Sequence, residues 1–529
     1  MKNYNLYEHT PVHTIKELLD FCATEFDKKE AFTYQNRKQD ISINFAEFKS
    51  QVNAFGTYLF KQGFNNYHIA VLGENSYEWI LTHFAVTCGG NVIVPIDKEL
   101  DAESIKELLI DSEAKALVHS NAYADIIEQL QEKLPDIIYI NMKDIPDFIE
   151  GGKNLIADGY VDYINVKVDK HKLASIVYTS GTTGKSKGVM LSHNNLMSDL
   201  YAASCNTKID GTSLLLLPLH HTFGLVAGLY SVMYYGHVLY INKSLKRIMD
   251  DFQKSKPQNT FVVPLIIETI YRNVWNTAKK QGKEKALRLL INISNALRRC
   301  KIDLRKQLFK SVLNIFGGNL EVIICGGAPL NPKIVNGFDD FGITVLNGYG
   351  ITECSPIVTV NRNKYNIIGS VGLPLCCNKL RIAKDGEVLV KGDNVMLGYY
   401  HNETESEKAF VDGWFKTGDL GRIDEYGTLH ITGRIKNLII LSNGENVPAE
   451  SIEEEVYTIS YVKECVAYGE DNIIVVEAYL DKEMTDARVR INNDIKIINQ
   501  RLPQIRNIGK VVIRDIEFPK TTTKKIKRY

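Results

Sequence analysis

The chain has 529 residues, 44% of them hydrophobic, which is more than one compact core usually needs, so two or more domains are expected. Lysine plus arginine and aspartate plus glutamate both number 63, so the formal net charge is zero. A balanced charge gives no reason to expect a nucleic acid as partner. The 27 tyrosines and 20 phenylalanines argue for a globular chain rather than a disordered one.

The cysteine pattern and the apolar runs predict a cytoplasmic protein. Nine cysteines are scattered without metal-ligand spacing, which indicates reduced thiols. The first eleven residues are polar and do not resemble a secretory signal. No uncharged apolar run approaches the ~20 residues that are needed to span a bilayer.

Short β-rich apolar runs alternate with helical patterns in the first part of the chain. We expect strands at 69–72, 92–96 and 116–119, and helices at 77–88 and 105–110. The strand pattern recurs at residues 174–179, 213–217, 238–241, 261–263 and 322–325. Such alternation predicts an α/β fold, with parallel-rich sheets that are covered by helices.

The second part of the chain departs from this rhythm. Residues 266–316 are helical in composition and are expected to leave the sheet. After residue 371 the chain is β-rich, and turn signals at residues 385–386 and 426–427 predict a small antiparallel subdomain at about 370–433. A helix is expected to begin at Pro448 and to carry Ile452 and Val456 on one face.

A loop at residues 179–188 carries the strongest chemical signal. It combines glycines, hydroxyls and lysines in the run Thr179, Ser180, Gly181, Thr182, Thr183, Gly184 and Lys185. Glycines let backbone N–H groups approach an anion, and hydroxyls and lysines add donors and charge, which suits the β- and γ-phosphates of ATP. A Walker-type loop would need a glycine at position 179, so a kinase-like loop is disfavoured. A polar surface loop is the simplest alternative.

This loop resembles the signature of the adenylate-forming superfamily, which comprises acyl-CoA synthetases, luciferases and the adenylation domains of peptide synthetases. Other segments resemble further motifs of this superfamily in the same order: residues 217–224, 326–330, 347–353, 414–419 and 433–437. The resemblance implies a large N-terminal AMP-binding domain at residues 1–435. It also implies a small, mobile α+β C-terminal domain at residues 436–529.

The resemblance assigns roles to residues of the N-terminal domain. His221 would lie beside the carboxylate and acyl site, and Gly327 and Ala328 would line the adenine. The Gly348-Tyr349 step would place the tyrosine ring on the adenine, and Thr352 would bond the α-phosphate. Glu353, together with Thr182, would bind Mg²⁺ as a hard oxygen ligand. Without the resemblance, a lone histidine is more often structural, and His220 keeps that interpretation.

The resemblance assigns further roles near the end of the chain. Asp419 would accept from the ribose hydroxyls, Arg434 would reach the ribose or phosphate, and Lys436 would be the hinge. Gly444 would leave room for the pantetheine arm of CoA. Lys525 would stabilise the adenylation transition state. A glycine usually stands where this chain has Lys524, so the choice between the two lysines stays open, and a solvated basic terminus is the alternative.

The implied activity is ATP-dependent formation of an acyl-AMP, with release of pyrophosphate, followed by transfer to CoA. Amino-acid-activating relatives place an aspartate shortly after the position of His221, and residues 222–229 contain none, which favours an apolar acid because a buried ammonium would be unpaired. The helical excursion and the basic tail resemble long-chain fatty acyl-CoA synthetases.

Three alternatives stay open at this point: transfer to an acyl carrier protein, an adenylation domain for another carboxylic acid, and a catalytically inactive nucleotide- or lipid-binding protein. The excursion also carries a basic face that is compatible with peripheral contact with anionic lipid, although a solvated helix face is the simpler interpretation. That face comprises Arg288, Arg298, Arg299, Lys301, Arg305 and Lys306.

Overall fold

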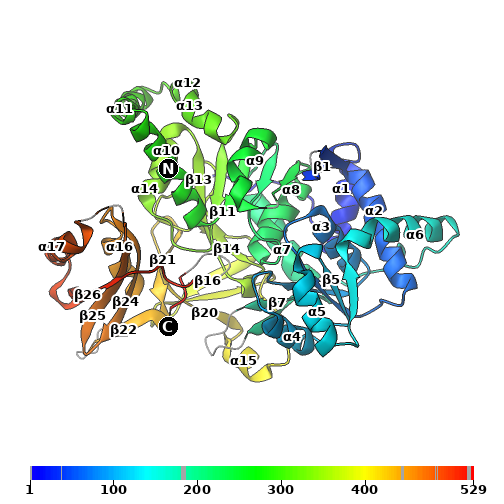
Figure 1. Ribbon diagram of the computed structural model, residues 1–529. Helices are drawn as coiled ribbons and strands as arrows, with labels where there is room; N and C mark the ends of the chain where they lie inside the picture. The colour runs from blue at the N-terminus through cyan, green and yellow to red at the C-terminus, as the bar shows by residue number, and fades with distance from the viewer. Residues whose placement is uncertain are drawn as a thin grey trace. The chain divides into compact units, whose positions relative to one another are not determined.

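The structure is a computed structural model that describes residues 3–36, 39–179, 186–242, 244–441, 446–482, 484, 486–520 and 526–528. The chain forms two compact units (Figure 1). Unit 1 comprises residues 1–379 and 391–410, and unit 2 comprises residues 380–390 and 411–529. Among the described residues, no helix has the length and apolar character that crossing a membrane requires.

The first sheet of unit 1 has the strand order β18-β8-β7-β4-β3-β5-β6. The five strands from β7 to β6 are parallel, whereas β8 is antiparallel to β7 and β18 is antiparallel to β8. The strands are β3 (His68–Leu72), β4 (Val92–Ile96), β5 (Ala116–His119), β6 (Ile138–Asn141), β7 (Leu173–Thr179), β8 (Lys187–Ser192) and β18 (Gly398–Tyr399).

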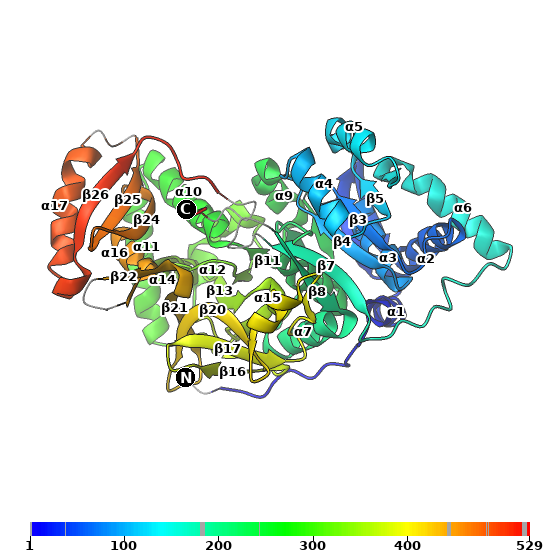
Figure 2. The same cartoon turned by 90° about the horizontal axis from the view of Figure 1, so that it is seen from below.

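Helices cover both faces of this sheet (Figure 2). In α3 (Tyr77–Cys88) every residue except Glu78 is buried, as expected for a helix that is apolar all round. On the opposite face, α4 (Ala102–Asp111) buries Ile105, Leu108 and Leu109 against the strands and leaves Ile110 exposed. The predicted helix at 77–88 and the predicted strands at 92–96 and 116–119 coincide with α3, β4 and β5.

The second sheet of unit 1 has the order β15-β14-β13-β12-β11-β9-β10-β1-β2. The strands from β13 to β1 are parallel, and antiparallel strands flank them on both sides. The strands are β1 (Glu30–Asn36), β2 (Gln39–Asn44), β9 (Ser213–Leu215), β10 (Leu239–Ile241), β11 (Asn259–Val262), β12 (Val322–Cys325), β13 (Thr344–Gly350), β14 (Ile357–Val360) and β15 (Leu373–Pro374).

The other helices of unit 1 surround these two sheets. The longer ones are α1 (Ile15–Glu25), α2 (Phe45–Lys61), α5 (Ala124–Lys133), α6 (Ile145–Ala157), α7 (His193–Asn206), α9 (Ile248–Ser255), α10 (Pro264–Lys280), α11 (Glu284–Arg299) and α14 (Pro332–Phe341). The shorter ones are α8 (Ser231–Tyr234), α12 (Arg305–Leu308), α13 (Lys310–Leu313) and α15 (Glu403–Lys408).

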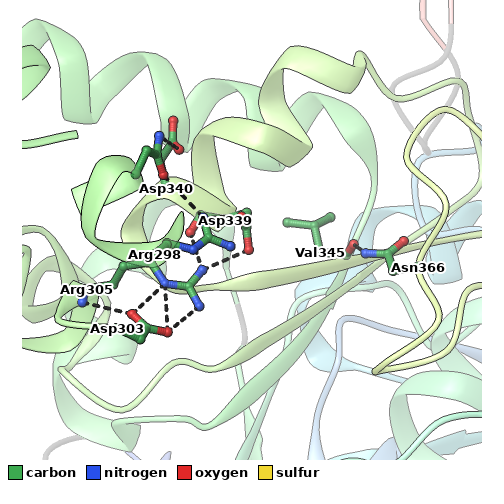
Figure 3. A network of polar contacts seen from close by, with 8 residues as sticks. Arg298, Asp303, Arg305, Asp339, Asp340, Val345 and Asn366 are labelled. Atoms are coloured by element: carbon green, nitrogen blue, oxygen red, sulfur yellow. Dashed lines mark hydrogen bonds and ion pairs between the residues drawn. The ribbon is translucent and has the colours of Figure 1, made fainter. Parts of the chain in front are cut away.

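The predicted helical excursion is present as α10 to α13, which Figure 1 shows in green beside α14 and β13. Ion pairs fasten it to α14, as Figure 3 shows: Asp339 accepts from Arg298 at 2.8 Å and from Arg305 at 2.9 Å. Arg305 also pairs with Asp303 at 2.7 Å, and this guanidinium lowers the pKa of Asp303 to about 2. One carboxylate therefore binds two separate segments of the excursion to the helix that packs on β13.

Unit 2 contains a three-stranded sheet in which β25 is antiparallel to β24 and parallel to β26. Ile452 and Val456 of α16 are fully buried, as the sequence predicted, and α17 buries residues at helical spacing in the same core. The elements are β24 (Val462–Glu470), β25 (Ile473–Leu480), β26 (Ile508–Arg514), α16 (Ala449–Val456), α17 (Ala487–Asn499) and the pair β22 (Leu438–Ile440) and β23 (Asn446–Pro448).

The predicted β-rich segment forms antiparallel strands, most of which belong to unit 2: β17 (Glu387–Gly392) pairs with β20 (Trp414–Ile423), and β20 pairs with β21 (Leu429–Arg434). The flanking strands are β16 (Asn378–Ile382) and β19 (Phe410–Val411). The end of β21 packs on the start of α16, since a Cβ on Gly433 would lie 2.9 Å from Glu450 Oε2. The division between the two compact units therefore falls before the β20–β21 pair. The domain boundary after residue 435, next to the expected hinge at Lys436, stays a prediction.

The two ion pairs of Asp339 make a stability prediction. Asp339→Ala should lower the free energy of unfolding by about 1 kcal/mol, because both guanidinium groups lose a partner that is only partly solvated. Chemical denaturation monitored by tryptophan fluorescence would measure this change. The matched control is Lys306→Ala, whose pair with Glu321 is more exposed, at 70% and 52% of the side chains, and should cost less. Equal losses in the two variants would contradict the assignment.

Candidate adenylation site

The predicted phosphate loop connects two antiparallel strands of the first sheet. Thr179 ends β7 opposite Lys187, which begins β8. Ser180, Gly181, Thr182, Thr183, Gly184 and Lys185 lie outside the described residues. A Walker-type loop runs from a strand into a helix, whereas this loop runs into β8. The structure therefore agrees with the exclusion of a kinase-like loop.

Strand pairing beside the loop brings Tyr399 to Glu353, because β8 follows the loop and β18 carries Tyr399. β18 pairs with β8, and the buried Tyr399 hydroxyl donates to Glu353 Oε1 at 3.0 Å. The backbone N–H of Met396 also donates to the Glu353 carbonyl at 2.8 Å. Burial and the charge of Glu353 both raise the pKa of Tyr399, so this phenol stays a donor. The carboxylate predicted to bind Mg²⁺ is thus held from β18, the strand that pairs with β8.

Lys187 adds positive charge at the same place. Its Nζ atom lies 5.0 Å from the centre of the Tyr399 ring and 2.6 Å from Glu405 Oε2. Only 18% of the Lys187 side chain is exposed, and the carboxylate of Glu405 at the start of α15 balances its charge. The base of the phosphate loop is therefore a paired cation rather than a solvated lysine.

Two glycine-rich segments meet where the parallel strands β12 and β13 end. Cys325 of β12 pairs with Asn347 of β13, so the next residues of both strands lie side by side. A Cβ on Gly326 would lie 3.4 Å from the Gly348 carbonyl oxygen and 3.3 Å from the Phe223 ring. Gly327 has φ +88°, a conformation that favours glycine. The segments predicted to hold the adenine are therefore neighbours.

The chain continues from β13 into the residues predicted to contact the phosphates. Tyr349 and Gly350 end the strand, and Thr352 and Glu353 lie in the short 3₁₀-helix Thr352–Cys354. A Cβ on Gly350 would lie 2.0 Å from the Pro356 carbonyl oxygen, so no side chain fits at this turn. The turn places Tyr349, Thr352 and Glu353, all half-buried, within a few residues of one another.

The loop that carries His221 is fixed by a side chain from the first sheet. Asn75 follows β3; its amide donates to the Leu217 carbonyl at 2.8 Å, and its oxygen accepts from the Leu219 N–H at 3.0 Å. The ring of the half-buried His221 lies 4.3 Å from the ring of His220, measured between centroids. The loop is therefore placed by two hydrogen bonds that the sequence did not indicate.

His220 is buried, and its Nε2 atom lies 3.4 Å from Asp97 Oδ1, just beyond β4. Burial and the neighbouring His221 lower the pKa of His220 well below its usual value. Ligand atoms of Asp97, His220 and His221 lie within 4.8 Å of one another. The structural interpretation of His220 fits its burial in the core as a neutral ring.

An apolar helix follows the histidine loop. Residues Phe223–Tyr230 form a π-helix, a form that is rare and frequent at functional sites. Every residue from Gly224 to Tyr230 is buried, and none of the residues in the helix is charged. The helix that follows His221 is therefore apolar throughout.

The remaining predicted residues belong to unit 2. Asp419 is 2% exposed and its Oδ1 atom lies 2.7 Å from Arg434 Nε, across the β20–β21 pair. Partial desolvation and the charge of Arg434 lower the pKa of Lys436, in the short helix after β21. Asp419 and Arg434 are therefore brought together, with Lys436 next along the chain. Gly444 and Lys525 lie outside the described residues.

The fold is that of the adenylate-forming enzymes, and comparisons with known proteins identify the family. The family model described as AMP-binding enzyme matches residues 19–400, and the chain belongs to this family. The prediction of the superfamily and of its α/β architecture is confirmed.

The chain is similar to several named proteins. It is 29% identical to the long-chain-fatty-acid–CoA ligase FadD15 of Mycobacterium bovis, over 85% of this chain and 81% of the relative. It is 28% identical to the long-chain-fatty-acid–CoA ligase ACSBG2 of Homo sapiens, over 85% of this chain and 74% of the relative. The anthranilate CoA ligase AuaEII has a similar fold, with a TM-score of 0.79 at 19% identity, over 99% of this chain and 97% of that structure. These similarities support an AMP-binding ligase.

Tyr399 makes a testable prediction. Tyr399→Phe should raise the Mg²⁺ concentration needed for half-maximal ATP–pyrophosphate exchange by about tenfold, because Glu353 loses the donor that orients it. Titration of the exchange rate with Mg²⁺ would measure the shift. Tyr400→Phe is the matched control, since Tyr400 donates to the exposed Glu113 instead. An unchanged Mg²⁺ requirement in the Tyr399 variant would refute this role.

Proposed function

We propose that the protein activates a fatty acid with ATP to an acyl-AMP and then transfers the acyl group to CoA. The observation that carries this proposal is the grouping of Glu353, Tyr349 and Thr352 at the end of β13, where Tyr399 of β18, the strand that pairs with β8, donates to Glu353. Long-chain fatty acids are the favoured substrates.

Two observations favour an apolar acid. The π-helix after His221 is buried and uncharged, so it offers no partner for the ammonium of an amino acid. Two relatives in different organisms are long-chain-fatty-acid–CoA ligases by name. Solved structures with the same fold include an anthranilate CoA ligase and MatB from Rhodopseudomonas palustris with ATP bound. The identity of the acid therefore remains part of the proposal.

The first step is the in-line attack of a carboxylate oxygen on the α-phosphorus of ATP. A new P–O bond forms, the bond to the β-phosphate oxygen breaks, and pyrophosphate leaves. Thr352 would donate to an α-phosphate oxygen, Tyr349 would stack on the adenine, and His221 would lie beside the carboxylate. Asp419 would accept from the ribose hydroxyls, and Lys525 would offset the negative charge that spreads over the phosphate oxygens.

Glu353 fits a magnesium ligand, because it is a half-buried carboxylate whose orientation is fixed through Oε1. Thr182, in the phosphate loop, is the second proposed ligand. When bound, Mg²⁺ neutralises phosphate charge during the transfer.

The second step joins the acyl group to a thiol. The sulfur attacks the acyl carbonyl carbon, the bond to AMP breaks, and the thiol proton passes to solvent. We propose CoA as the thiol, with Gly444 leaving room for its arm and Lys436 as the hinge between the two steps. An acyl carrier protein is the alternative acceptor, and a direct comparison of carrier protein with free CoA would distinguish them.

The decisive experiment measures ATP–pyrophosphate exchange with straight-chain acids of graded length, and then thioester formation after CoA is added. Exchange should rise with chain length and reach its maximum with long-chain acids, because each buried methylene adds binding free energy of about 0.8 kcal/mol. Aromatic acids and malonate serve as the comparison substrates. Maximal exchange with one of these, and none with fatty acids, would reject the fatty-acid substrate while keeping adenylation.

The thiol acceptor site makes a separate prediction. Gly444→Trp should leave exchange within about twofold of the wild type but reduce CoA thioester formation at least about tenfold, since the indole would fill the proposed thiol path. Single-turnover assays of the two half-reactions would show this split. Lys280→Trp is a control, because Lys280 is exposed at the end of α10 in the helical excursion. Equal loss of both half-reactions in the Gly444→Trp variant would contradict the proposed thiol path.

A further inference from the structure

The C-terminal tail is held against unit 2 by a closed set of polar contacts. Lys520 and Ile526 form an antiparallel bridge, and the Lys527 N–H donates to the Pro519 carbonyl at 2.8 Å. The chain that leaves at residue 520 therefore returns beside itself at residue 526. In the sequence the proposed catalytic Lys525 directly precedes Ile526, and it lies outside the described residues.

The first part of the tail, up to residue 520, is attached to β24. Lys520 forms an ion pair with Glu464 and a second one with Glu517 at 2.7 Å. The Phe518 N–H donates to the other oxygen of Glu464 at 2.8 Å, and the Phe518 side chain is 3% exposed. One carboxylate of β24 thus binds both a main-chain and a side-chain donor of the tail.

The end of the tail, at Arg528, is attached to α16. The Arg528 guanidinium contacts Glu453 and lies 3.7 Å from Glu450, and these two glutamates share one face of the helix at a spacing of three residues. The Glu453 side chain is 9% exposed and also accepts from the Ala467 N–H at 2.7 Å. A carboxylate buried this deeply requires a cationic partner, and Arg528 supplies it.

The same helix also holds the segment next to the proposed hinge. The Asn437 amide donates to Glu450 Oε1 at 2.5 Å, one residue after Lys436. Glu450 therefore contacts both the hinge segment and the tail. A rotation of unit 2 about the hinge would carry α16 and the tail together as one body.

We propose that Arg528, Glu453 and Glu450 are positioning residues for Lys525, which fix the end of the tail on α16 so that the lysine reaches the α-phosphate in one place. This inference rests on the proposed adenylation and on the assignment of Lys525. None of the three residues needs to touch the substrate. Their effect is on the placement of the lysine, where a shift of about 1 Å can cost about a hundredfold in rate.

The burial of Glu453 supports an energetic reason for this arrangement. Burial raises the pKa of Glu453 to about 7, against the attraction of Arg528 and the Ala467 N–H, while the charge of Glu450 adds to the increase. Removing Arg528 would therefore leave a buried carboxylate that takes up a proton and releases the tail.

The test compares Arg528→Ala, Arg528→Lys and Glu453→Gln in the full chain, with Lys510→Ala as control. Lys510 pairs with Glu470 at 2.8 Å in unit 2, at a site where the two side chains are 51% and 44% exposed. Hydrogen–deuterium exchange of peptides that cover residues 515–528 reads the anchoring directly. ATP–pyrophosphate exchange and thioester formation from supplied acyl-AMP read the two half-reactions separately.

Arg528→Ala should increase deuterium uptake in the tail and lower the kcat of exchange by about tenfold or more, with the KM for ATP within about twofold. Thioester formation from supplied acyl-AMP should stay within about twofold of the wild type, since the proposed lysine acts only in the first step. Arg528→Lys should recover part of the loss, Glu453→Gln should lie between the two, and Lys510→Ala should match the wild type.

Unchanged uptake in the Arg528→Ala tail would overturn the anchoring, and raised uptake with unchanged exchange kcat would overturn the positioning role. Equal loss of both half-reactions, together with a lower melting temperature, would show a purely structural role and would also overturn it. If none of the acids tested supports pyrophosphate exchange by the wild-type protein, the proposed function itself is rejected. In that case the uptake measurement would still confirm or overturn the attachment of the tail.

Discussion

The close approach of backbone segments at the ends of β12 and β13 is the constraint on which the candidate site depends. A Cβ at Gly326 would press on Gly348 and Phe223, and one at Gly350 would overlap the Pro356 carbonyl. Gly350 leaves no room for a side chain at the turn toward Glu353, and Gly326 lets the two strand ends and Phe223 approach closely. Parallel pairing forces such convergence, because neighbouring strands release their chains at the same edge of the sheet.

Much of this architecture follows from local sequence patterns. The continuous apolar runs of β4 and β5 are typical of strands buried on both faces, and α3 is apolar on all sides, so their positions could be predicted closely. The glycine-rich segments could be recognised because glycine at fixed spacing reflects a backbone requirement. The predicted bounds of β9 and β11 differ from the observed ones by one to two residues, since short strands between loops have little periodicity to define their ends.

The contacts that orient the site residues could not be predicted in this way. Tyr399 lies 46 positions from Glu353 and belonged to no motif considered, yet strand pairing with β8 brings its hydroxyl to the carboxylate. Asn75 lies more than 140 positions from the loop that it holds, and a single asparagine before a helix looks like an ordinary cap. Long-range partners of this kind depend on register and burial, which a local pattern does not encode.

A division of labour between the two units follows from where the charges lie. In unit 1 the acidic Glu353 is oriented by a neutral phenol, which leaves its negative charge available to a cation. In unit 2 two buried acids are paired with arginines: Asp419 with Arg434, and Glu453 with Arg528. Paired charges of this kind act mainly by fixing geometry, since the loss of one partner leaves the other uncompensated. Under the proposed function, the oriented Glu353 binds a cation that arrives with the nucleotide, whereas the ion pair of Glu453 and Arg528 holds the tail of unit 2 in place.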